Sequence, residues 1–121
     1  MNKQINYWIH GPKACGKTIL AKQIVGPEGR VISARNCTES AMLRMARECT
    51  RIVIDDYNEK SSPCKSLVTS GFSVVSRANA AKLDGISKDP PLETLVIISE
   101  WPPQGPALRR RFHIITVTPP V

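Results

Sequence analysis

The stretch Gly11-Pro12-Lys13-Ala14-Cys15-Gly16-Lys17-Thr18 decides the fold of this chain, because it is a complete G-x-x-x-x-G-K-[ST] string. An apolar run at residues 5–9 comes directly before it, and a helical pattern at 19–25 follows directly. A phosphate-binding loop requires this context, namely a strand, a tight loop and a helix whose N-terminus faces an anion. The stretch therefore predicts a nucleoside triphosphate site in which every residue from 11 to 18 takes part in nucleotide binding.

The residue types in the loop have separate expected roles. Gly11 and Gly16 are expected to adopt backbone dihedrals closed to other residues, so that the backbone N–H groups of residues 13–17 wrap the β-phosphate. Lys17 is expected to be catalytic, with its ammonium reaching the β- and γ-phosphate oxygens. Thr18 is expected to offer its hydroxyl to Mg²⁺. ATP and Mg²⁺ are therefore the predicted cofactors.

Length and charge limit the kind of protein that this can be. The chain has 121 residues, which predicts a single P-loop ATPase domain over residues 1–121 with no room for a separate nuclease, primase or origin-binding module. Its 17 lysines and arginines against 10 acids give a net charge of +7. A nucleotide site accounts for part of this excess, and the remainder favours a nucleic-acid partner over a merely basic surface. The apolar runs are too short to cross a bilayer and no signal peptide is apparent, so we expect a cytoplasmic protein without a membrane partner.

Apolar runs and helical periodicity alternate along the chain. Strands are predicted at residues 5–10, 30–34, 51–54, 94–99 and 112–117, and helices at 16–25 and 38–49, the latter with Thr38 as its N-cap. A weak helix at 60–70 and two arms of a hairpin or extended loop at 72–76 and 82–86 are predicted between them. Because the strands are continuously apolar and alternate with helices, we expect an α/β P-loop NTPase fold, with a mainly parallel five-stranded sheet and helices on both faces.

Two carboxylates, Asp55 and Asp56, directly follow the apolar strand at 51–54. In open α/β sheets the carboxyl ends of the strands form the ligand-binding edge. Asp55 is expected to hold Mg²⁺ opposite Thr18, and Asp56 is expected to be catalytic by orienting or deprotonating the attacking water. The alternative is that the two acids only end the strand as turn formers.

The C-terminal part of the chain contains two further candidate groups. Ser99 and Glu100 end the apolar strand at 94–99 and are expected to act as sensors beside the γ-phosphate, the alternative being a solvated strand end. Residues 109–111 are consecutive arginines, too many for all of them to face the chain's own nucleotide. They are interpreted as an arginine finger for a neighbouring subunit, as contacts to a nucleic-acid backbone, or as a solvated charge run.

This order of motifs resembles the superfamily 3 helicase domain of small DNA viruses and phages, a branch of the AAA+ group. The resemblance covers residues 7–117, with the start of motif A at 7–12, motif B at 52–56, motif B′ at 74–86, motif C at 94–103 and the finger segment at 108–112. Motif C in that family normally ends on Ser-Asn, whereas this chain has Ser99-Glu100. An acid at this place is expected to repel the γ-phosphate and to slow hydrolysis.

The resemblance implies a replication motor that hydrolyses ATP and moves along single-stranded DNA as an oligomeric, hexameric ring. ATP is then bound between subunits, with Arg110 or Arg111 as the catalytic residue that acts in trans. Arg77 and Lys82 fall in the motif B′ hairpin, which in that family projects into the pore and binds single-stranded DNA. The implied partners are further copies of the chain and a replication initiator or other replisome protein, in the cytoplasm or nucleus of a host cell.

Three alternative functions remain open at this point. A helicase-loader-like AAA+ accessory ATPase carries the same motifs without unwinding DNA. A nonhydrolysing, nucleotide-dependent nucleic-acid-binding module is favoured by Glu100. A small-molecule kinase needs an acceptor pocket and an arginine-bearing lid, and the arginines at 109–111 lie too close to the last strand to form a long lid.

Overall fold

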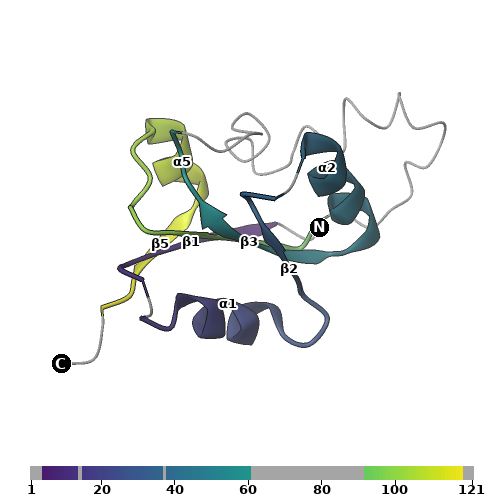
Figure 1. The fold of residues 1–121 in the computed structure, drawn as a ribbon, viewed down its shortest axis with the longest axis horizontal. Helices are drawn as coiled ribbons and strands as arrows, with labels where there is room; N and C mark the ends of the chain where they lie inside the picture. Colours follow the sequence, from purple (N-terminus) through teal and green to yellow (C-terminus); the bar gives the residue numbers. More distant parts are fainter. Residues whose placement is uncertain (1–3, 14, 37, 61–91, 119–121) are drawn as a thin grey trace.

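A computed structural model of the protein describes residues 4–13, 15–36, 38–60 and 92–118. Strands and helices alternate along these ranges, as the apolar pattern predicts (Figure 1). In chain order they are β1 (Ile5–His10), α1 (Lys17–Val25), β2 (Arg30–Ser33), α2 (Glu39–Glu48), β3 (Arg51–Tyr57), β4 (Thr94–Ser99), α5 (Pro106–Arg111) and β5 (His113–Thr116).

The strands of the described ranges form one five-stranded sheet in the order β2-β3-β4-β1-β5, and every neighbouring pair is parallel. β4 therefore lies between β1 and β3, although it follows both of them in the sequence. At its carboxyl end, Ser99 stands opposite His10 of β1 and Tyr57 of β3. The segments that follow these three strands consequently meet at one edge of the sheet. The predicted parallel sheet is confirmed.

Helices cover both faces of the sheet, as predicted. α1 lies on one face, whereas α2 and α5 lie on the other (Figure 1). The core beneath α1 is formed by Ile9, Ala21, Val25, Val53, Val96 and Ile98. The core on the opposite face is formed by Trp8, Ala34, Met42, Ile52, Ile54, Tyr57, Leu92, Leu95, Ile97, Leu108 and Phe112. Because the inner strands β3 and β4 bury side chains on both faces, their sequences are apolar without alternation.

β3 continues beyond its predicted end at Ile54 and runs through both acids to Tyr57. Its register with β4 shifts between Ile54 and Tyr57, and Asp56 has a φ of 59°. Such a bulge bends a strand and redirects the side chains on either side of it. Asp56 is exposed while Tyr57 is buried, so the bulge lets the strand carry its acids at the edge and then return to the core.

The short helix α5 is missing from the sequence prediction. Leu108 is its buried residue, so its sequence lacks the repeated apolar positions that reveal a helix. The helix begins after Gly105 with Pro106 in its first turn, where the missing proline N–H costs no hydrogen bond. Three arginines occupy its last turn, which suits the negative end of the helix dipole.

The remaining boundaries agree closely with expectation. Thr38 is the N-cap of α2, and its Oγ1 accepts a hydrogen bond from the Ala41 N–H at 3.2 Å. β5 is shorter than predicted by one residue at each end. Apart from Lys60, the predicted helix at 60–70 and the hairpin arms at 72–76 and 82–86 lie outside the described residues. Within the described ranges, no helix is long and apolar enough to traverse a membrane.

Candidate functional site

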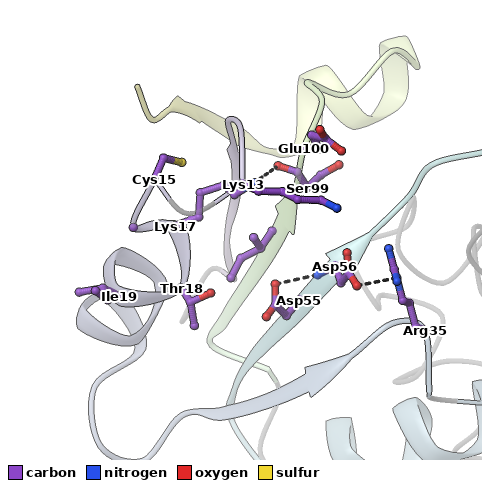
Figure 2. A pocket seen from close by; sticks show the side chains of 12 residues that line it. Lys13, Cys15, Lys17, Thr18, Ile19, Arg35, Asp55, Asp56, Ser99 and Glu100 are labelled. Carbon is purple, nitrogen blue, oxygen red and sulfur yellow. Dashed lines mark hydrogen bonds and ion pairs between the residues drawn. The ribbon is translucent and has the colours of Figure 1, made fainter. Parts of the chain in front are cut away.

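A pocket of about 480 Å³ lies at the carboxyl edge of the sheet, between the phosphate loop and the ends of β3 and β4 (Figure 2). This volume is in the range of small-molecule sites. The residues that line it are Lys13, Cys15, Gly16, Lys17, Thr18, Ile19, Arg35, Asp55, Asp56, Ile98, Ser99 and Glu100. The fold thus brings together the loop residues, the two acids and the strand-end pair that the sequence singles out.

Gly16 shapes the junction between the loop and α1. It is the N-cap of the helix and has a φ of 91°, a left-handed conformation that residues with a Cβ avoid. Its carbonyl accepts the first helical hydrogen bond, from the Leu20 N–H at 3.1 Å. The first turn of α1 contains no acidic residue and receives no side-chain cap, so the start of the helix offers a positive electrostatic environment at the pocket.

Gly11 is needed for a different reason from the one expected. Positive φ values occur among the described glycines at Gly16 and Gly26, so the expectation of special dihedrals is wrong for Gly11. A Cβ on Gly11 would instead lie 2.3 Å from the carbonyl oxygen of Val117. The Val117 N–H donates to the His10 carbonyl at 2.9 Å, which holds the segment after β5 against the loop. Glycine provides space here rather than backbone freedom.

Gly11→Ala is therefore expected to destabilise the protein by about 1–3 kcal/mol, because the added methyl overlaps backbone atoms that cannot rotate away. Gly105→Ala is the matched control, since its Cβ would meet nothing closer than 3.7 Å and its φ is −70°. Urea unfolding followed by circular dichroism measures both free energies. Equal stability of the two variants would contradict the close approach of Val117.

The ammonium of Lys17 lies between the loop and β4. Its Nζ donates a hydrogen bond to the Gly11 carbonyl. It donates a second, at 3.3 Å, to the Ser99 carbonyl (Figure 2). Charged phosphate oxygens are stronger acceptors than neutral carbonyls, so this donor is placed to bind an anion in the pocket. His10 lies nearby and pairs with the Thr116 hydroxyl at 2.9 Å. Burial, together with the charge of Lys17, lowers the pKa of His10 from its ordinary value of 6.5.

The two residues at the end of β4, Ser99 and Glu100, differ in their exposure to solvent. Ser99 is buried, and its Oγ accepts a hydrogen bond from the Trp101 N–H at 3.3 Å, which closes the turn after β4. Glu100 is exposed on the pocket wall. Both therefore line the pocket, but Ser99 contributes from a buried position and Glu100 from the solvent side.

The two acids are arranged as a hydrogen-bonded pair. Oδ1 of Asp55 accepts from the Asp56 N–H at 2.7 Å. Asp56 in turn forms an ion pair with Arg35, with Nε and Oδ2 separated by 2.6 Å (Figure 2). Sequence reasoning missed Arg35. It follows β2, and the parallel pairing of β2 with β3 is what brings it to the acids, so only knowledge of the strand order could have found it.

The arginines of α5 do not line this pocket. Arg109 is bound within its own chain, because its Nε donates to the Pro103 carbonyl at 2.9 Å. Arg110 and Arg111 are exposed. Gly11 and Pro12 belong to the loop but not to the pocket wall, and Ala14, Arg77 and Lys82 lie outside the described residues. In the described part of the chain, no group of three or more histidine, cysteine or acidic residues is placed to hold a metal ion.

Comparison with known proteins supports the fold. No protein-family model matches the chain, and no curated protein does. Among solved structures it is similar to a point mutant of RuvB from Thermotoga maritima, with a TM-score of 0.59 and 15% sequence identity. The similarity covers 97% of this chain but only 38% of that one. Together with the all-parallel strand order, it shows an α/β P-loop NTPase fold.

Proposed function

We propose that the protein binds and hydrolyses ATP and acts as a superfamily 3 helicase-like motor on single-stranded DNA, assembled as an oligomeric ring. One observation carries this proposal: residues 13 and 15–18 of the phosphate loop, both acids and the strand-end pair line a single pocket in a P-loop fold. A chance match of the loop string has no reason to place Asp55 and Asp56 beside it. Acids that only end a strand as turn formers likewise need not line the same pocket as the Lys17 ammonium.

The residues of the pocket match the needs of phosphoryl transfer. Lys17 binds the β- and γ-phosphate oxygens in exchange for its backbone carbonyl partners. Thr18 and Asp55 line the same pocket and are hard oxygen donors, so they fit a Mg²⁺ ion that takes its other ligands from phosphate and water. Such an ion, when bound, neutralises charge on the phosphates. Asp56 orients the attacking water.

The ion pair with Arg35 bears on the role of Asp56. The Arg35 guanidinium, 2.6 Å from Oδ2, holds the carboxylate of Asp56 at the pocket wall. The exposed fraction is 69% for the Arg35 side chain and 49% for the Asp56 side chain. Solvent or a ligand can therefore separate this ion pair. Asp56 is thus available as a water-orienting group rather than locked into the core.

Asp56→Asn is expected to keep ATP binding and to lower hydrolysis by about 10²–10⁴-fold, the usual contribution of a positioned base. Arg35→Ala is the comparison variant, because it removes the ion pair and leaves the carboxylate in place. Calorimetric ATP titration and steady-state turnover measure the two effects separately. Loss of ATP binding in Asp56→Asn would mean that this acid is structural or a metal ligand.

Single-stranded DNA is the nucleic acid along which the protein is proposed to move. The net charge of +7 supports a polyanionic partner, and the resemblance assigns the contact to Arg77 and Lys82. The test is ATP hydrolysis by the purified protein with and without single-stranded DNA, alongside Lys17→Ala. Strong stimulation that is lost in the variant supports the motor. Hydrolysis indifferent to DNA favours a helicase-loader-like ATPase instead.

A second candidate function rests on Glu100. Its carboxylate is exposed on the pocket wall, where it opposes the entry of a triphosphate. This favours a module that binds nucleotide and nucleic acid without hydrolysis. Glu100→Asn distinguishes the two candidates, since a gain in turnover shows that the acid restrains a working ATPase. Absence of turnover in both forms, with ATP bound, supports the nonhydrolysing module.

A further inference from the structure

Glu59 connects two segments that are far apart in the sequence. It follows β3 in the chain, and its Oε1 accepts a hydrogen bond from the Gln104 N–H at 2.8 Å. Its Oε2 accepts from the Gly105 N–H at 3.2 Å. These two amides directly precede α5, and hydrogen bonds to an ionised carboxylate are stronger than neutral ones. One side chain thus holds the start of the arginine-bearing helix.

The end of the same helix is held by an aromatic contact that leads back to β3. Tyr57 packs edge-on against Trp8, with ring centroids 5.6 Å apart. Trp8 packs edge-on against Phe112 at the same separation, and Phe112 is the C-cap of α5. A helix of six residues is too short to be stable on its own, so these anchors determine where it lies.

The strand end that provides the anchors also provides the acids. Asp55 and Asp56 line the pocket, whereas Tyr57 and Glu59 extend toward α5. The bulge at Asp56 lies between the two sets. The pocket acids and the anchors of the helix that carries residues 109–111 are therefore joined through one short segment of the chain, residues 55–59.

We infer that Glu59 is a positioning residue: it sets α5 relative to the nucleotide pocket and so couples the chain's own site to the arginine offered to a neighbouring subunit. The inference rests on the proposed function for the trans-acting arginine. The coupling between the pocket and α5 is a separate part of the inference, and it can be tested without ATP hydrolysis.

The first test is turnover by Glu59→Ala and Glu59→Gln. Misplacing a catalytic group by about 1 Å costs about 10²-fold, so Glu59→Ala is expected to lose up to this factor in turnover with the ATP dissociation constant within about 2-fold of wild type. Glu59→Gln keeps one acceptor oxygen, so its turnover should lie between that of Glu59→Ala and that of the wild type. Glu28→Gln removes the same charge from an exposed turn and serves as the control. Equal turnover in Glu59→Ala and wild type would overturn the inference.

A double variant separates positioning from general damage. If Glu59 acts through Arg110, adding Glu59→Ala to Arg110→Ala should cause no further loss. Mixing Glu59→Ala with Lys17→Ala protein should restore activity, because the former keeps an intact pocket and the latter an intact arginine. Failure of this mixture, while Arg110→Ala with Lys17→Ala succeeds, would place the defect in the pocket of Glu59→Ala and overturn the inference.

Hydrogen exchange tests the coupling without turnover. A nonhydrolysable ATP analogue, at concentrations where calorimetry shows it bound, is expected to change exchange at residues 104–111 in the wild type and not in Glu59→Ala. No change in the wild type would refute the coupling. By contrast, unchanged turnover in Arg110→Ala would refute only the proposed action of Arg110 in trans. Failure of the coupling and failure of the proposed function are therefore distinguishable.

Discussion

Lys17→Ala is expected to reduce ATP hydrolysis by at least about 10²–10³-fold, the loss seen when one preorganised donor to a developing charge is removed. The ammonium lies between the Gly11 and Ser99 carbonyls at the pocket, and no other described cation joins the loop to β4 in this way. Alanine leaves no donor for the phosphate oxygens. Steady-state phosphate release over a range of ATP concentrations measures the effect.

The control for this variant is Lys22→Ala, in the last turn of the same helix and exposed to solvent. It removes an equal charge far from the loop and should keep turnover within about 2-fold, since surface substitutions have small effects. Loss of two hydrogen bonds is expected to lower the free energy of unfolding of Lys17→Ala by about 1–2 kcal/mol. Urea unfolding should therefore be measured, to confirm that the variant is folded and that lost turnover does not reflect unfolding. Undiminished hydrolysis would remove the phosphate-loop assignment.

Arg110→Ala is expected to lower turnover by about 10³–10⁵-fold if this side chain is the arginine finger. The structure distinguishes among the three arginines. The Arg109 side chain is held by the Pro103 carbonyl, and Arg111 also has interactions within its own chain. Arg110 is exposed and, among the described residues, its side chain has no hydrogen bond or ion pair, so it is the arginine best placed to reach another subunit.

Complementation shows whether Arg110 acts in trans. Neither Arg110→Ala nor Lys17→Ala is expected to turn over ATP alone, whereas a mixture forms interfaces that contain an intact pocket and an intact arginine. Activity should pass through a maximum as the mixing ratio changes. Arg109→Ala is the matched control and should lose much less activity. A mixture that stays inactive at every ratio would argue against the trans action of Arg110.

Much of the fold could be predicted because local sequence patterns indicate most of its strands and helices. The apolar runs located all five strands of the described ranges, and Thr38 marked the start of α2. Local patterns failed at α5, where a single buried leucine gives no periodicity, and at β3, where polar residues continue a strand. In both places long-range packing stabilises a conformation that the neighbouring residues do not favour.

The sequence by itself determined the phosphate loop and the candidate acids, because a loop that binds phosphate and a strand that ends on carboxylates depend on near neighbours along the chain. Only the tertiary structure decided which distant groups meet. The insertion of β4 between β1 and β3 brings the Ser99 carbonyl to Lys17, and the pairing of β2 with β3 brings Arg35 to Asp56. Strand order is set by how whole segments pack their apolar faces, and no local pattern contains that information.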